Sequence, residues 1–348
     1  MLSPNAQGHV TPIKTNNKTA STCIATVTYG NRKHLLTQMI EGGHEQGVTR
    51  FVVVNNGAQW DVNELKNIFP ELDIEIVDMG GNTGSAGGFA AAIQRAYDLG
   101  AEFIWLLDDD NKTQEHCLQA LLEAYEREEA TTPRDRLAVL AFRPEHQADV
   151  AAGVPIKRIN ARRDSFCGFH VYDIPYKIWR RTPWGHPRGP VAEKVCLDVA
   201  PYSGLLFRRE LVSAIGLPDA RLVLYADDTE YTWRITARGG KIFLVTAARL
   251  DDLESSWNIK KRFSNSLIGW LTGSGDYRAY YGMRNQAYFD SHFRRRFAPL
   301  FALNRFIYLG LLHMYAHRLR LMSRYKLLKS ASADGLAGRL GVHPEYRL

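Results

Sequence analysis

The stretch FIWLLDDDNK at residues 103–112 ends a run of large apolar residues with three consecutive aspartates. An apolar run of this kind belongs in a buried strand, where an unpaired carboxylate is costly. Three adjacent carboxylates also repel one another, and their hard oxygen ligands suit Mg²⁺ or Mn²⁺. A solvated loop or an acidic cluster at a helix start would explain the aspartates too, so the neighbouring strands must decide between these interpretations.

Apolar strands and amphipathic helices alternate on both sides of this stretch. We expect strands at 21–30, 49–58, 73–81 and 101–110, and helices at 32–47, 89–100 and 116–130. This alternation predicts an α/β fold with a mostly parallel, Rossmann-like sheet and helices on both faces. Ligands of such sheets bind beyond the carboxyl ends of the strands. Those ends carry Thr28, Asn55, Asn82 and the aspartates Asp108–Asp110.

The segment GNTGSAGG at residues 81–88 is rich in glycine and opens a helix. Its spacing does not fit the G-x-G-x-x-G fingerprint, and it follows the third strand instead of the first, so binding of NAD is not indicated. Backbone N–H groups of such a loop can still hold a diphosphate at the helix start. A phosphate-sized loop beside three aspartates favours the metal interpretation, although Asn55-Asn56-Gly57 also fits a plain turn.

Composition excludes several classes of protein. The chain of 348 residues is 45% hydrophobic and 23% charged, which rules out a disordered or collagen-like chain. Its four cysteines are scattered without a C-x-x-C spacing, so neither a zinc site nor a disulfide framework is indicated. Residues 1–20 are polar and contain no apolar core of a secretory signal, and we expect them to form a disordered tail.

Positive charge is concentrated near the C-terminus. Residues 291–348 contain eleven Lys or Arg against Asp334 and Glu345, a local charge of +9 within a total of +7. Nucleic acid and an anionic membrane surface are both possible partners for such a segment. As one continuous helix, residues 303–328 would place the basic side chains of His313, His317, Arg320 and Arg324 on one face. This pattern favours membrane-surface binding over a spanning helix, and ordinary packing on the domain is the alternative.

Five motifs in order resemble family 2 glycosyltransferases with the GT-A fold. They are VTYGNRKHL, VVVNNGA, GNTGSAGGF, WLLDDDN and the segment 202–245, whose helix carries D-x-E-x-x-x-R at Asp228, Glu230 and Arg234. The resemblance covers about residues 21–258. It implies a nucleotide-sugar half at 21–115, an acceptor half at 116–258, and a basic, helical, membrane-associating region at 259–348.

The resemblance also implies roles for individual residues. In this family the aspartate motif binds Mn²⁺ or Mg²⁺ together with the donor diphosphate, which matches Asp108, Asp109 and Asp110, with Asp110 as the direct metal ligand. Asp252 stands near the place where the family has a histidine as a further ligand, and Asp251 or a structural turn is the alternative there. The donor would contact Thr28, Asn55, Asn82, Gly84, Gly87 and Arg284.

A carboxylate must accept the proton of the attacking sugar hydroxyl. Asp228 matches the catalytic base of the family, and its neighbour Asp227 is the competitor. Both side chains, with Glu230, could instead cap the helix that follows and favour its dipole. One base and direct displacement imply inversion at the anomeric carbon. Candidate acceptor contacts are Trp184, His186, Ser203 and Gly204.

The set of motifs most resembles the branch of bacterial galactofuranosyl- and rhamnosyltransferases. It implies transfer of galactofuranose from UDP-galactofuranose, or of rhamnose from dTDP-rhamnose, onto a lipid-linked surface polysaccharide such as an O-antigen of lipopolysaccharide. The enzyme would act at the inner face of the plasma membrane and would bind no nucleic acid. A nucleotidyltransferase, a nucleic-acid-binding module and a non-catalytic sugar-binding scaffold remain the alternatives from other classes.

Overall fold

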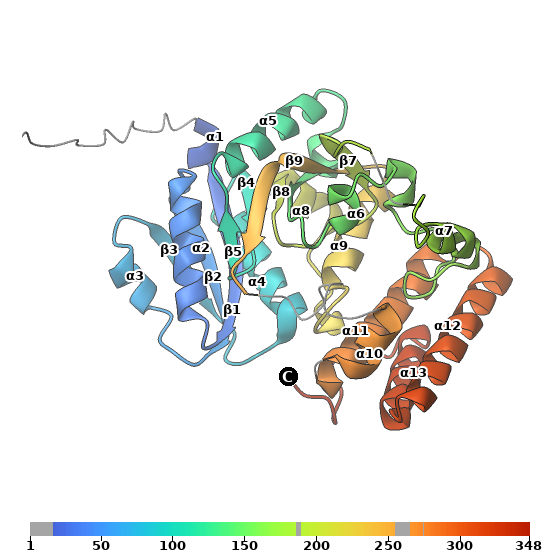
Figure 1. Ribbon diagram of the computed structural model, residues 1–348. Helices are drawn as coiled ribbons and strands as arrows, with labels where there is room; N and C mark the ends of the chain where they lie inside the picture. The colour runs from blue at the N-terminus through green and yellow to red at the C-terminus, as the bar shows by residue number, and fades with distance from the viewer. Residues whose placement is uncertain (1–16, 186–188, 255–264, 274) are drawn as a thin grey trace, which may run out of the picture.

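The structure, a computed structural model, describes residues 17–185, 189–254, 265–273 and 275–348. Within these ranges, nine strands form one curled sheet in the order β3-β2-β1-β4-β8-β6-β9-β5, with β7 beside β9 (Figure 1). The strands are β1 Thr22–Gly30, β2 Arg50–Ala58, β3 Asp73–Asp78, β4 Phe103–Leu106, β5 Asn111–Thr113, β6 Leu137–Phe142, β7 Lys194–Leu197, β8 Leu205–Arg208 and β9 Lys241–Asp252.

Helices follow most of the strands. Those of the first 260 residues are α1 Asn17–Ala20, α2 Lys33–Glu45, α3 Glu64–Ile68, α4 Gly84–Asp98, α5 Cys117–Glu129, α6 Ala148–Ala151, α7 Ile174–Trp179, α8 Arg209–Ile215 and α9 Asp227–Ala237. The C-terminal region contains α10 Ser266–Thr272, α11 Asp276–Phe289, α12 Ala298–Arg318 and α13 Met322–Leu336, with a π-helical turn at Asp290–Arg294. The predicted fold class, an α/β sheet followed by a helical region, is confirmed.

The first half of the sheet is parallel. Strands β3, β2, β1 and β4 all run in one direction, and β8 lies antiparallel between β4 and β6. Parallel pairing of β6 with β9 then continues the original direction. The carboxyl ends of β1, β2, β3 and β4 therefore meet at one edge, as the sequence predicts.

Helices cover both faces of the sheet because the side chains of its strands alternate. Along β1, Cys23 and Ala25 pack into the cluster that contains α4, α8 and α9. Ile24, which points to the opposite face, packs into the cluster that contains α2, α3 and α5. Each face of the sheet thus buries an apolar layer, and these two layers hold the strands and their carboxyl ends in place.

Two local predictions at the site edge are wrong. Strand β4 ends at Leu106, before the aspartates, which lie in the turn between β4 and β5. Helix α4 begins at Gly84 and not at Phe89, so residues 84–88 of the glycine-rich segment form its first turn and only 81–83 precede it. Gly84 has φ +82° and a Cβ there would lie 2.0 Å from the Val223 carbonyl oxygen, so only glycine allows this close approach.

The C-terminal helices form their own apolar cluster beside the sheet (Figure 1). The expected continuous helix over residues 303–328 is wrong, because α12 ends at Arg318 and the chain turns back into α13. Arg320 adopts φ +59°, and the Leu321 N–H donates to the Ala316 carbonyl, a Schellman-type ending. The basic face predicted for His313, His317, Arg320 and Arg324 is therefore divided between α12, the turn that follows it and α13.

None of the helices in the described ranges is long and apolar enough to span a bilayer. The domain boundary predicted at residue 258 falls outside those ranges and stays a prediction.

Candidate active site

A cleft of about 1630 Å³ opens beside the carboxyl ends of the first strands. Side chains from the strand ends, the segment after β6, the start of α9 and the C-terminal helices line it together. They include Tyr29, Arg32, Ser85, Asp108, Asp110, Arg143, His146, Ser203, Asp227, Asp228, Asp252, Tyr277 and Arg278. The cleft therefore joins two sets of carboxylates that are far apart in the sequence.

Asp109, the middle aspartate of the triplet, is bound by the protein itself. It is only 3% exposed, and its Oδ2 accepts a hydrogen bond of 2.9 Å from the Thr28 hydroxyl. The Arg32 guanidinium donates to both of its oxygens at 2.9 Å and lies 3.1 Å from Asp110. Asp109 thus anchors the turn to β1, and Arg32 offsets part of the negative charge of the triplet.

Asp108 and Asp110 line the cleft on either side of this anchor. Burial, with the nearby charge of Asp108, raises the pKa of Asp110 to about 6. Burial also raises the pKa of Asp108, and the charges of Asp109 and Asp252 add to this effect. Such crowded carboxylates gain from a bound cation, because it would relieve their mutual repulsion.

The described residues contain no group of three His, Cys, Asp or Glu side chains arranged to hold a metal ion. This does not conflict with a divalent cation at Asp108 and Asp110, since Mg²⁺ usually binds one or two carboxylates and completes its shell with water and substrate phosphate. The oxygen donors of these two residues fit such a site, in which water and a substrate phosphate would supply the other ligands.

Asp252 ends β9 directly opposite Asn111 of β5. Its carboxylate accepts bonds from Asn111 at 3.0 Å and Arg143 at 3.1 Å, and His146 Nε2 lies 2.7 Å away. Burial favours the neutral form of Asp252, but the bonds from His146 and Arg143 outweigh burial and lower its pKa. Asp252 is thus already paired, which makes it a poorer metal ligand than Asp108 or Asp110.

The second set of carboxylates opens helix α9. Asp227 is 2% exposed, its Oδ2 has no hydrogen-bond partner in the described structure, and burial next to Asp228 raises its pKa strongly. Asp228 is less buried and accepts a bond of 2.6 Å from the Thr229 N–H. Burial raises its pKa too, against this bond and the Thr229 hydroxyl. Asp228 therefore presents the more accessible carboxylate to the cleft.

The turn before α9 is strained. Tyr225 and Ala226 have φ of +67° and +58°, in the left-handed region that costs about 1–2 kcal/mol per non-glycine residue. Val223, at φ +67° and ψ −66°, is the centre of a γ-turn closed by the bond from the Leu224 N–H to the Leu222 carbonyl. The Asn285 side-chain amide holds this turn, because its Nδ2 donates to the carbonyls of Leu222, Leu224 and Tyr225 at 2.6, 2.8 and 2.9 Å. Helix α11 thereby fixes the position of the aspartates.

Arg284, predicted to contact the donor, lies on the same helix but does not reach the cleft. It is 1% exposed, and its guanidinium donates to the carbonyls of Gly341 at 2.6 Å and Leu222 at 3.1 Å. Its position between α11, the strained turn and the C-terminal segment makes a structural role the better interpretation.

The predicted nucleoside contacts lie beside the cleft and do not line it. Asn55 accepts a bond from the Ala58 N–H at 2.9 Å, and Asn82 accepts one from the Gly84 N–H at 3.0 Å. Both side chains therefore stabilise local turns. Thr28, Gly84 and Gly87 are likewise absent from the cleft lining, to which the same segments contribute Tyr29, Arg32, Ser85 and Phe89 instead.

The predicted acceptor contacts fall in different places. Ser203 lines the cleft and its hydroxyl donates to Asn111. Gly204 lies behind it with φ +91°, and a Cβ there would contact Leu250 at 2.8 Å. Trp184 is 77% exposed and lines no part of the cleft, and His186 lies outside the described residues.

Sequence reasoning missed three residues that organise the site. Arg32 and His146 pair with the carboxylates, and Asn56 ties β2 to the start of α4 through Thr83 at 2.8 Å. A cation directly after β1 was a usable signal for Arg32, because three buried aspartates need a counter-charge. His146 carried no such signal.

Comparison with known proteins shows which proteins the chain resembles. Residues 23–171 match the model of the glycosyl transferase family 2. Galactofuranosyltransferase GlfT1 of Mycolicibacterium smegmatis is 25% identical over 224 residues, which are 62% of this chain and 66% of the relative. GlfT1 of Mycobacterium tuberculosis is 28% identical over 159 residues, 45% of each chain. The chain thus spans less than two thirds of the length of these relatives.

Among solved structures, GalNAc-T7 with UDP, GalNAc and Mn²⁺ superposes with a TM-score of 0.48 at 12% identity, over 66% of this chain and 43% of that one. Staphylococcus aureus TarS 1-349 superposes with a TM-score of 0.43 at 13% identity, over 90% and 88%. From the family match and the GlfT1 similarity, the chain carries a family 2 glycosyltransferase domain over residues 23–171 and is related to galactofuranosyltransferases.

Proposed function

We propose that this protein is an inverting glycosyltransferase that moves a sugar from a nucleotide-sugar donor onto a glycan acceptor. The observation that carries the proposal is the single cleft in which Asp108 and Asp110 are joined with Asp227 and Asp228. One pair suits a donor diphosphate with its cation, and the other suits a general base. The family 2 match over the first of these pairs supports the same assignment.

The residues divide the reaction between them. The acceptor hydroxyl oxygen attacks the anomeric carbon, its proton passes to Asp228, and the bond to the nucleotide diphosphate breaks. Attack on the face opposite the leaving group inverts the anomeric centre. Asp227, whose pKa is raised by burial and by its neighbour, keeps a proton, so that a single negative charge lies at the start of α9.

The donor side depends on charge. Asp110 and Asp108 would hold Mn²⁺ or Mg²⁺ together with the diphosphate, and this ion would offset the charge that builds up on the leaving group. Arg278 also lines the cleft and would contact phosphate oxygens, whereas Arg32 stays with Asp109, Asp110 and Glu254. Asp252 stays with its His146 and Arg143 partners in this proposal.

For the donor sugar we favour galactofuranose carried by UDP. Support comes from the GlfT1 relatives, whose name describes galactofuranosyl transfer. Rhamnose carried by dTDP is the alternative. The acceptor would be a growing bacterial surface polysaccharide, of the O-antigen type, linked to a lipid.

A membrane-bound acceptor would bring the enzyme to the inner face of the plasma membrane. Helix α12 supports this, because it exposes Leu303, Phe306 and Met314, with Phe306 77% exposed. The exposed cations Arg295 and Arg296 lie just before the helix. Apolar side chains beside cations suit an anionic membrane surface.

Calorimetric titration of UDP and dTDP, each with and without Mn²⁺, tests the donor site. We expect Mn²⁺-dependent binding of UDP that is lost in Asp110→Ala. Asp251→Ala is the matched control, since Asp251 is an exposed carboxylate on the same strand as Asp252 and its removal should change nothing. Binding of dTDP instead of UDP would select the rhamnose alternative. Absence of binding by both nucleotides would refute the proposal.

A further inference from the structure

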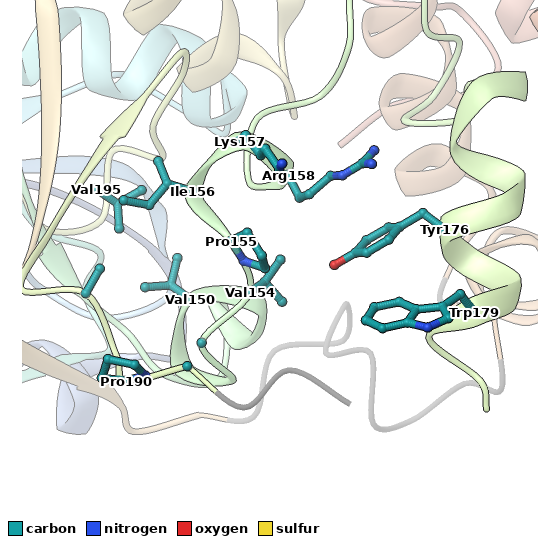
Figure 2. A pocket seen from close by; sticks show the side chains of 13 residues that line it. Val150, Val154, Pro155, Ile156, Lys157, Arg158, Tyr176, Trp179, Pro190 and Val195 are labelled. Carbon is teal, nitrogen blue, oxygen red and sulfur yellow. The ribbon is translucent and has the colours of Figure 1, made fainter. Parts of the chain in front are cut away.

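A second pocket, of about 560 Å³, lies next to the cleft, and none of the residues assigned above to donor binding or catalysis lines it. One wall is the segment from α6 to Arg158, and the other is helix α7. Figure 2 shows Tyr176 and Trp179 projecting from α7 toward Val154 and Pro155 on the opposite wall.

The chemistry of this pocket is mainly apolar. Val150, Val154, Pro155, Pro190 and Val195 form most of its surface, and the rings of Tyr176 and Trp179 stack with centroids 5.7 Å apart. Sugar sites combine an aromatic ring with several hydroxyl-binding amides or carboxylates, and among the described residues that line this pocket there is no such amide or carboxylate. An apolar group is therefore the better ligand.

Cations lie at the boundary where the pocket joins the cleft. Lys157, Arg158 and Tyr176 line both cavities, so the two are continuous there. Arg158 lies 4.5 Å from the centroid of the Tyr176 ring and 3.4 Å from Asp173, which also pairs with Arg162 at 2.6 Å. Two arginines thus share one carboxylate and Lys157 adds a further cation to the lining, which leaves this boundary positively charged.

The apolar walls of the pocket and the cations at its boundary together favour one kind of ligand. This ligand is an apolar chain with an anionic group at its end.

We propose that this pocket binds the apolar chain of an amphiphilic acceptor, whose phosphate or diphosphate group lies against Lys157 and Arg158. The sugar attached to that group would then extend into the cleft toward Asp228. The placement of the sugar toward Asp228 rests on the proposed function, whereas binding of an amphiphile in the pocket does not depend on it.

Binding of methyl, octyl and decyl phosphate to the purified full-length chain tests the pocket, at concentrations below micelle formation. Each buried methylene contributes about fourfold in affinity, so octyl phosphate should bind at least tenfold more tightly than methyl phosphate. Trp179→Ala and Ile156→Asp should remove most of this chain-length dependence. Both side chains are about half exposed, 47% and 50%, so the variants should fold.

Trp184→Ala is the matched control, because Trp184 lies on the same segment but outside the pocket lining. It should leave the chain-length dependence unchanged, and Lys157→Ala should weaken binding of all three phosphates. UDP binding, measured in the same samples, separates the two hypotheses. Normal UDP binding with no chain-length dependence would overturn the pocket assignment alone. Equal effects of Trp179→Ala and Trp184→Ala, or displacement of octyl phosphate by a free sugar, would also overturn it.

Discussion

Replacement of Asn285 by alanine should show how far the site depends on its strained turn. The amide nitrogen of Asn285 serves the carbonyls of Leu222, Leu224 and Tyr225 with only two hydrogens, so the variant loses about two full hydrogen bonds. At about 1–1.5 kcal/mol each, the free energy of unfolding should fall by about 2–3 kcal/mol. Most of this loss of stability should fall on the turn that positions Asp228.

The expected effect on catalysis follows from the same figures. If 2–3 kcal/mol of support for the left-handed turn is lost, kcat should fall about 30-fold to 160-fold, with little change in the KM for the donor. Unfolding in urea gives the stability, and steady-state transfer at saturating substrates gives kcat. Ala226→Gly should restore part of the loss, because glycine adopts positive φ without strain.

Arg208→Leu is the matched control for Asn285→Ala. Arg208 is buried and pairs with Glu102 and Glu129 at the opposite end of β8 from Ser203, so its loss should reduce stability without lowering kcat. If Asn285→Ala lost stability but kept its kcat within twofold, the turn would not need this amide and the reasoning would be refuted.

Three further predictions follow from the site. Arg32→Ala leaves Asp109 buried without its partner, so the free energy of unfolding should fall by about 3 kcal/mol at pH 8. The fall should be smaller at pH 5, where the Asp109 carboxyl can take up a proton, and an equal fall at both pH values would contradict this prediction. Asp227→Asn should stabilise the fold at pH 8 and have little effect near pH 4, because the raised pKa of Asp227 in the folded state means that its ionisation at higher pH costs stability. Urea unfolding at both pH values measures the effect, and a stabilisation that is larger at pH 4 than at pH 8 would contradict this prediction. Phe306→Asp should reduce co-sedimentation with vesicles containing anionic lipid without changing UDP binding, whereas Lys66→Asp, on the exposed face of α3, should not.

Local patterns in the sequence were sufficient for the parallel half of the sheet. Strands β1 and β2 are recognisable in the sequence as apolar runs that end in turn residues. The Asp227-Asp228 pair stands at the start of a segment whose apolar residues recur with the period of a helix. Because carboxyl ends of parallel strands share an edge, the grouping of Thr28, Asn55 and the aspartate triplet also followed from sequence.

Contacts between distant segments were not predictable in the same way. Arg32 meets Asp109 across 77 positions, and Asn285 meets Leu222 across 63, so no spacing rule connects them. The break after α12 was hidden for another reason, since arginine at position 320 is compatible with a helix and only packing of α13 against α11 requires the turn. At Gly335 a Cβ would lie 2.0 Å from the Arg284 carbonyl, which reflects how closely these two helices approach.

The most direct test of the central claim is turnover by Asp228→Asn with the donor sugar nucleotide that the calorimetry selects. The variant keeps the shape of the side chain but removes the group that accepts the proton. We expect unchanged nucleotide binding with a loss of transfer of at least a thousandfold, while Asp227→Asn retains measurable transfer. Transfer by Asp228→Asn within tenfold of the wild type would contradict the assignment of Asp228 as the base, and with it the proposed mechanism.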